Sequence, residues 1–375
     1  MLIRFHSRLT CRDPEPARMK TLYLHIGTHK TASSTLQLFF ARNKNRLARS
    51  GFYYPVEGSY YLGIENSQSL LSHSLRNARP AYIPKRVNFT RQGCIADIRR
   101  DIQNSACENV LVSSEHFSHS ATHEEVEAIR SAFSQVVSTI KVIVYLRRQD
   151  QRIESGYNQQ VKSGLVFAGF REYAEGILAD PGNAFRYDLL LGRFAEVFGE
   201  ENIIARPFEK GQLHPQGIIF DFLEILGVEP ATDFPVPQAL NKSLPAEMIE
   251  VMRLIGAHFP GIEHRRMFNR FVMSAPLGID NRPHTFFTDE LRNRVLTAFE
   301  ASNRLVAKKY LGRESGELFR ESAKGELPLY EGLSAERLAQ ISARIWALQE
   351  SRKALLRQEP GRQNPARGMA GTTRQ

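Results

Sequence analysis

The chain has 375 residues, of which 42% are hydrophobic and 24% are charged. That composition is typical of a globular protein with one large domain or one domain plus appendages, and it excludes a mainly disordered chain. The 50 lysines and arginines outnumber the 40 aspartates and glutamates, and the resulting formal net charge of +10 suits an anionic partner.

Cysteine, apolar and basic patterns exclude further classes. The three cysteines are odd in number and unpatterned, which favours a reducing, cytoplasmic setting over a disulfide framework. No run of 18 apolar residues predicts a transmembrane segment. Zinc-finger spacing and basic aromatic RNA-binding motifs are absent from the sequence, so no nucleic-acid partner is expected. Residues 1–18 are basic and lack the apolar middle of a secretory signal, so we expect a disordered leader, with Met19 as an alternative start.

The first predicted strand, residues 22–26, runs into a turn that contains Gly27 and Lys30, and a helix follows from about residue 36. Such a strand–turn–helix presents backbone N–H groups and the positive end of a helix dipole to an anion. Lys30 adds a full positive charge. Hydroxyl donors come from Thr31, Ser33, Ser34 and Thr35. Without a ligand, the same residues would be an ordinary capped turn.

The position of Lys30 distinguishes this turn from the common nucleotide-binding loop. A Walker A loop has four residues between its two glycines, followed by lysine and then serine or threonine. Here Lys30 comes three residues after Gly27, with no second glycine before it. The spacing therefore disfavours an ordinary nucleotide kinase or ATPase.

The next elements continue an alternation of strands and helices. We expect a helix at residues 36–50, a short extended piece at 51–55, a helix at 91–106 and a buried strand at 109–116 with a polar end. This alternation predicts an α/β fold with a central parallel sheet flanked by helices.

Polar side chains form the end of the strand predicted at residues 109–116. Ligands of an open α/β sheet bind beyond the carboxyl ends of its strands, so we expect Glu115 and His116 at the mouth of the turn. Glu115 is the candidate general base, with His116 and, less favoured, His29 as alternatives; a helix cap is the other role open to Glu115. His116, His119 and His123 have helix-like spacing but no accompanying carboxylate pattern, so no metal site is expected.

The clearest buried strand, residues 140–146, ends in Arg147, and a helix that contains Ser155 follows it. Arg147 could fork onto a phosphate, and the Ser155 hydroxyl, two turns into the helix, could donate a second hydrogen bond. The pair predicts a second anion site on the same edge of the sheet.

These two motifs together resemble those of sulfotransferases. The run from Lys30 to Thr35 resembles the 5′-phosphosulfate loop, in which lysine precedes Thr-Gly-Thr-Thr or a near variant; Ala32 stands where the family usually has glycine. An alanine fits there without strain if the backbone is right-handed helical. Arg147, with Ser155 eight residues later and an aromatic residue two places further on, resembles the 3′-phosphate motif. The resemblance covers most of the chain.

The resemblance implies a P-loop-like sulfotransferase fold and 3′-phosphoadenosine 5′-phosphosulfate as the sulfuryl donor. The implied donor-binding residues are His29, Lys30, Thr31, Ala32, Ser33, Ser34, Thr35, Arg147 and Ser155. Lys30 would stabilise the leaving phosphate oxygen, and Glu115 or His116 would take the proton of an acceptor hydroxyl or amine. The resemblance makes a carbohydrate or glycoconjugate the expected acceptor. The alternatives are a nucleotide-kinase-like phosphotransferase and a non-catalytic protein that binds a nucleotide or a glycan.

The C-terminal part is predicted to be helical, with amphipathic helices at residues 288–310 and 333–356. We expect a sulfotransferase domain at residues 19–312, a helical extension at 313–358 and a disordered tail at 359–375. The last helix, which carries the single tryptophan, would pack on the domain or pair with a second copy in a homodimer.

Overall fold

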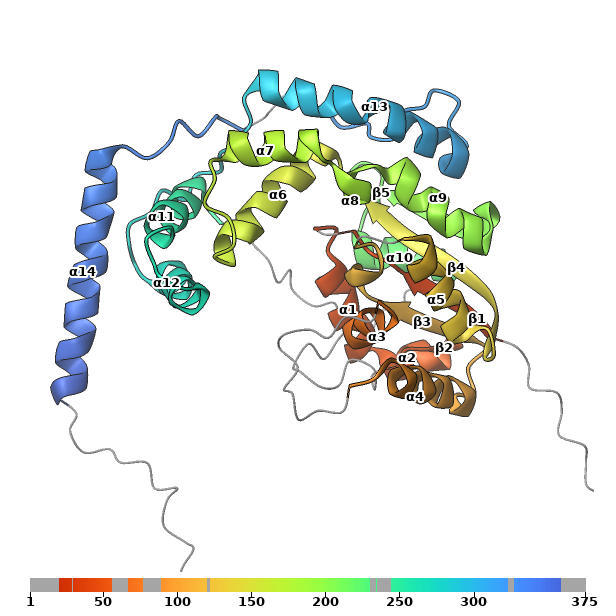
Figure 1. Ribbon diagram of the computed structural model, residues 1–375. Coiled ribbons are helices and arrows are strands. Elements are labelled where there is room, and N and C mark those ends of the chain that lie inside the picture. The colour runs from red at the N-terminus through yellow and green to blue at the C-terminus, as the bar shows by residue number, and fades with distance from the viewer. Residues whose placement is uncertain are drawn as a thin grey trace, which may run out of the picture. The chain divides into compact units, whose positions relative to one another are not determined.

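The computed structural model describes residues 20–28, 30–55, 67–76, 89–119, 122–229, 234, 244–322 and 327–358 (Figure 1). The predicted leader, the candidate residue His29 and the predicted tail at 359–375 lie outside these ranges. The chain forms two compact units. Unit 1 comprises residues 1–156, 171–242 and 287–324, and unit 2 comprises residues 157–170, 243–286 and 325–375. The expected boundary after residue 312 stays a prediction.

Unit 1 is built on a parallel sheet (Figure 1). Its five strands are β1 (Lys20–His25), β2 (Phe52–Tyr53), β3 (Asn109–Ser113), β4 (Val137–Leu146) and β5 (Ile203–Pro207). They lie in the order β2-β3-β1-β4-β5, and every neighbouring pair is parallel. The sheet, with helices on its faces, confirms the predicted α/β class.

Alternate strand residues face opposite sides of this sheet, and each side has its own core. Leu24 and Val142 belong to one cluster of buried side chains, whereas Leu111 and Ile143 belong to the other. The first cluster is covered by α3 (Ser69–Leu75), α4 (Arg91–Asn104), α5 (His123–Phe133), α9 (Tyr187–Phe198) and α13 (Asp289–Leu311). The second is covered by α1 (Ser33–Arg42), α2 (Lys44–Arg49) and α10 (Ile218–Leu226). A sheet buried on both faces explains why the strand sequences are continuously apolar.

The single helix predicted at residues 36–50 is wrong in one respect, because the structure divides it into α1 and α2 at Asn43. The Asn43 backbone has left the helical region, with φ −106°, and its side-chain Nδ2 donates to the Phe39 carbonyl at 3.0 Å. Asparagine competes with the helical backbone for hydrogen bonds, which favours a break at this residue.

The helix after β4 joins the two units in sequence. It is α6 (Gln149–Lys162), and two shorter helices of the same region are α7 (Phe170–Ala179) and α8 (Gly182–Phe185). The remaining helices are α11 (Ala246–Gly256), α12 (Ile262–Ser274) and α14 (Ala335–Gln358), which belong to unit 2. Trp346 on α14 is 68% exposed, and pairing of this helix with a second copy stays a prediction.

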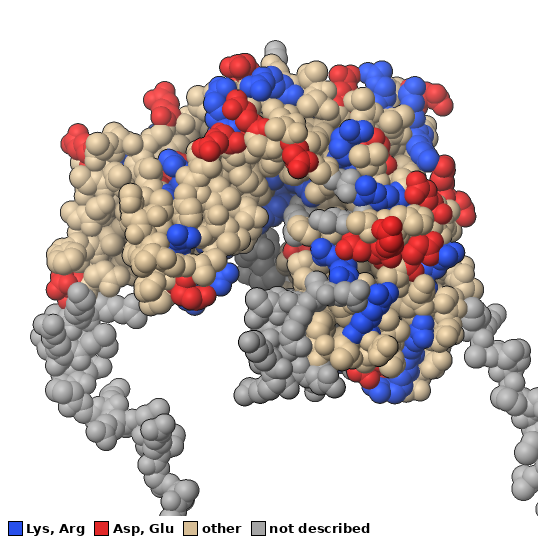
Figure 2. Space-filling view, viewed as in Figure 1, with Lys and Arg blue, Asp and Glu red and all other residues tan. Residues whose placement is uncertain are grey.

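The excess of basic residues is not gathered into one patch on the face shown in Figure 2. Lysines and arginines are interspersed there with aspartates and glutamates. Within the described ranges, no helix combines the length and the apolar character needed to cross a membrane.

Candidate active site

The site begins with the turn between β1 and α1, where three residues have a positive φ. They are Gly27 (φ 45°), Lys30 (φ 71°) and Ala32 (φ 59°). A left-handed backbone costs an L-residue about 1–2 kcal/mol, and two such residues lie in one short turn. Strain of this kind persists only where the surrounding structure fixes it, and it is concentrated at functional sites.

Ala32 settles a question that the sequence left open. With φ 59° and ψ 25°, it is left-handed and immediately precedes the first residue of α1. The right-handed backbone in which alanine would fit without strain is therefore not adopted, and glycine would fit the position with less strain.

The neighbouring strands supply the contacts that hold the turn. The Thr28 hydroxyl donates to the backbone carbonyl of Tyr145 on β4 at 2.7 Å. The Ser118 hydroxyl, beyond β3, donates to the Gly27 carbonyl, and Arg147 Nη1, directly after β4, donates to the Lys30 carbonyl at 3.0 Å. The turn is thus fixed from both adjacent strands.

Hydrogen bonds from protein groups occupy three backbone carbonyls of the turn. The carbonyls of Gly27 and Lys30 are taken by Ser118 and Arg147, and the Thr28 carbonyl accepts from the Thr31 hydroxyl at 2.7 Å. Because the Thr31 side chain is fully buried and donates within the turn, its contribution to an anion would come from its backbone N–H.

The donors at the start of α1 are not used in the same way. The Ala32 carbonyl accepts from the N–H groups of Thr35 and Leu36 at 3.0 and 3.1 Å, whereas the N–H groups of Ser33 and Ser34 have no intrahelical acceptor. The residue Ser33 is 3% exposed, and its hydroxyl has no hydrogen-bond partner within the described ranges. A buried hydroxyl without a partner is uncommon, and it marks this helix end as a place that an anion would satisfy.

Glu115 lies next to the turn, as the sequence predicted. A Cβ atom added to Gly27 would be 3.4 Å from Glu115 Cα and 2.8 Å from Ser33 Oγ. Glu115 begins a short 3₁₀ helix, Glu115–Phe117, which Ser114 caps by accepting from the His116 N–H at 3.3 Å. Ser114 thus caps this short helix, and Glu115 follows the carboxyl end of β3 by two residues.

Two histidines that the sequence did not single out lie in this neighbourhood. His25 is completely buried at the end of β1, and its Nδ1 lies 2.8 Å from Ser113 Oγ. Burial lowers the pKa of His25 to about 4, although the negative charge of Glu115 acts in the opposite direction. The ring of His73, on α3, contacts that of His116 with centroids 4.4 Å apart. Burial and the positive charge of His116 lower the pKa of His73 to about 4.

The buried His25 and the half-buried His73 are therefore both neutral at pH 7. His25 could have been suspected from the sequence, because it is a polar residue at the end of an apolar strand. His73 carried no such signal, since α3 was not predicted at all.

Arg147, which belongs to the second predicted anion site, also contacts the turn of the first. Besides its bond to the turn, its Nε donates to Gln151 Oε1 at 3.3 Å. Burial lowers the pKa of Arg147, but an arginine remains charged at neutral pH. Ser155 is half-buried on α6, about 9 Å along the helix axis from its first residue.

Comparisons with known proteins are sparse. No family model matches the chain. A protein of Archaeoglobus fulgidus, described as an uncharacterized protein, is 32% identical over 211 residues, which are 55% of each chain. The present chain therefore spans about half the length of that relative. Among solved structures, a sulfotransferase from Alicyclobacillus acidocaldarius is similar with a TM-score of 0.38 and 18% identity, over 66% of this chain and 94% of that one.

Proposed function

We propose that this protein is a sulfotransferase that moves a sulfuryl group from 3′-phosphoadenosine 5′-phosphosulfate to an acceptor hydroxyl or amine on a carbohydrate. The observation that carries the proposal is the donor-rich turn at residues 27–35. The carbonyls of Gly27, Thr28 and Lys30 accept bonds from protein groups, and the buried Ser33 hydroxyl lacks a partner within the part of the chain that the structure describes. Lys30 has the spacing of a phosphosulfate loop and not of a Walker A loop.

The transfer would be an in-line displacement at sulfur. The acceptor atom forms a bond to sulfur while the bond between sulfur and the bridging phosphate oxygen breaks, and the acceptor's proton passes to Glu115. Negative charge grows on the leaving oxygen, where Lys30 and the N–H groups at the start of α1 would stabilise it. Arg147 and Ser155 would bind the 3′-phosphate. His116 is the alternative base, and His29 is the less favoured one.

Sulfate transfer from labelled donor tests the roles of Lys30 and Glu115. Removal of one group that stabilises a developing oxyanion lowers the rate about 10²–10³-fold, which is the loss expected for Lys30→Ala. Loss of a general base lowers it about 10²–10⁴-fold, which is expected for Glu115→Gln with donor affinity unchanged. Lys44→Ala on α2 and Glu127→Gln on α5 are matched controls that should retain activity. Unchanged transfer by Lys30→Ala would show that the turn has another role.

Two further assays distinguish the alternative functions from sulfuryl transfer. Phosphate transfer from ATP that requires Mg²⁺ would identify a kinase-like enzyme. Binding of 3′-phosphoadenosine 5′-phosphate without transfer to any acceptor in a broad panel would identify a non-catalytic binding protein.

A further inference from the structure

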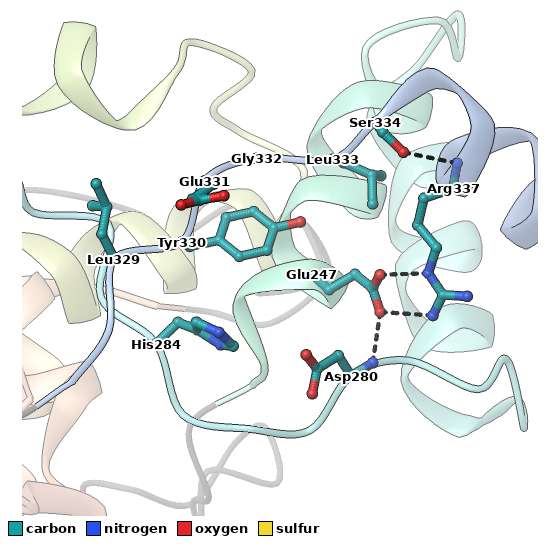
Figure 3. Close-up of a pocket in the computed structure, with 10 residues that line it drawn as sticks. All are labelled: Glu247, Asp280, His284, Leu329, Tyr330, Glu331, Gly332, Leu333, Ser334 and Arg337. Carbon is teal, nitrogen blue, oxygen red and sulfur yellow. Dashed lines mark hydrogen bonds and ion pairs between the residues drawn. The ribbon is translucent and has the colours of Figure 1, made fainter.

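Unit 2 contains a cavity of about 440 Å³ that the sulfuryl-transfer residues do not explain (Figure 3). It is lined by residues 329–334 together with Glu247, Asp280, His284 and Arg337. This volume is within the range of pockets that bind small molecules. All of these residues belong to unit 2, so the cavity lies within a single unit.

Hydrogen bonds between separate segments hold the cavity walls. Tyr330 N–H donates to the Thr285 carbonyl at 2.8 Å, and Thr285 N–H donates to the Pro328 carbonyl at 3.0 Å. On the opposite wall, the Arg337 guanidinium forks onto the Glu247 carboxylate with distances of 2.7 and 3.1 Å (Figure 3). This fork lowers the pKa of Glu247. The cavity is therefore formed before any ligand binds.

Most groups that face the cavity accept hydrogen bonds. His284 Nδ1 lies 2.9 Å from the Arg282 carbonyl. Because a carbonyl only accepts, Nδ1 of the neutral ring carries the proton and Nε2 is left as an acceptor. Glu331 is exposed and adds a carboxylate. The one cationic side chain in the lining, Arg337, is committed to Glu247 and to the Gly278 carbonyl, the latter at 2.7 Å.

Tyr330 gives the cavity an aromatic wall and an unsatisfied hydroxyl. Its ring lies between His284 and Leu333, and its hydroxyl points toward Leu333 and Glu247 (Figure 3). The hydroxyl oxygen is buried and has no hydrogen-bond partner in the described parts of the chain. Burial, with the nearby carboxylates of Glu250 and Glu247, raises the pKa of Tyr330, so the phenol stays protonated.

We propose that this cavity binds a sugar unit that carries a protonated amino group. A sugar hydroxyl would donate to His284 Nε2, and the ammonium group would pair with Glu331. The apolar face of the sugar ring would lie on the Tyr330 ring, which also attracts the adjacent cation. The charge of the lining favours a cation, because Asp280 is paired with Arg282 and Glu247 with Arg337, and Glu331 adds a further carboxylate. That this sugar belongs to the sulfuryl acceptor rests on the proposed function; the binding itself does not.

Calorimetric titration of the full-length protein with glucosamine, in the absence of a sulfuryl donor, tests the site. We expect saturable binding with a Kd of about 1 mM. Glucose and N-acetylglucosamine, which lack the positive charge, should bind about threefold more weakly. Equal binding of N-acetylglucosamine, or no saturable binding of glucosamine, would overturn the inference.

One variant places the ligand in the cavity. Glu331→Gln should weaken glucosamine binding about threefold, whereas Tyr330→Phe, which keeps the aromatic ring, and Glu336→Gln, which removes an exposed acid outside the cavity, should change nothing. Tyr330→Phe should retain the melting temperature of the wild type, because the lost hydroxyl has no hydrogen-bond partner. Wild-type affinity in Glu331→Gln contradicts the proposal. If the protein transfers a sulfuryl group to another acceptor but does not bind glucosamine, this inference is refuted and the proposed function stands. If it binds glucosamine but transfers no sulfuryl group, the inference stands and the proposed function is refuted.

Discussion

Replacement of Ala32 by glycine should stabilise the protein, although glycine substitutions usually destabilise. The alanine occupies a left-handed conformation with φ 59°, which costs an L-residue about 1–2 kcal/mol. Glycine removes that cost but adds freedom to the unfolded chain worth about 0.4–1 kcal/mol. The expected net effect is a gain of about 0.5–1 kcal/mol in the free energy of unfolding.

Ala301→Gly provides the matched control, because Ala301 is exposed in the middle of the right-handed helix α13 of the same unit. Ala301→Gly should lower the free energy of unfolding by about 1 kcal/mol. Urea unfolding followed by far-UV circular dichroism suits the measurement, since the single tryptophan lies in unit 2. A loss in Ala32→Gly equal to that in Ala301→Gly would refute the left-handed assignment and the account of the turn built on it.

Four further outcomes are expected. Gly27→Ala should cost at least about 1–2 kcal/mol in stability by urea unfolding, because its Cβ would lie 2.8 Å from Ser33 Oγ and its φ is 45°. Arg147→Lys should weaken donor binding about tenfold in a titration, since lysine lacks the guanidinium Nη1 that donates to the Lys30 carbonyl, while Arg49→Lys should not. Tyr145→Phe should lower the unfolding free energy by about 1–3 kcal/mol, because the buried Asp221 loses a donor at 2.7 Å. The folded pKa of His25, about 4, lies below its unfolded value of 6.5. Its contribution is therefore complete above pH 6.5 and lost as the pH falls toward 4, so His25→Asn should reduce the fall in stability over this window by about 3 kcal/mol.

The sequence predicted the fold well because its strands are buried on both faces. A strand such as β4, with Val142 to Leu146 all buried, has a continuously apolar sequence that few other structures produce. The polar residues at the strand ends, Glu115 and Arg147, were also predictable, because carboxyl ends of parallel strands share one edge of the sheet.

Other features depended on contacts between distant residues. The left-handed backbone of Ala32 carries no signal in a residue that favours right-handed helices; contacts such as the Arg147 bond to the Lys30 carbonyl hold the turn. Likewise, α3 contains three buried serines, and a serine-rich composition is typical of a loop. His73 could not be foreseen for that reason.

The occupied carbonyls of the turn also bear on how it could select its ligand. Ser118, Thr31 and Arg147 donate to the carbonyls of Gly27, Thr28 and Lys30, which would otherwise repel an anion. With these three acceptors engaged, the turn would offer an anion its N–H donors and the Lys30 charge, and concave arrangements of N–H groups bind oxyanions. Arg147 is the support that is itself charged, so it would act on the anion twice: directly through its field, and indirectly by orienting the Lys30 peptide. We therefore expect Arg147→Gln to weaken donor binding more than Ser155→Ala, which removes one neutral hydroxyl. Equal losses in a donor titration would mean that the bond between Arg147 and the Lys30 carbonyl does not contribute to binding.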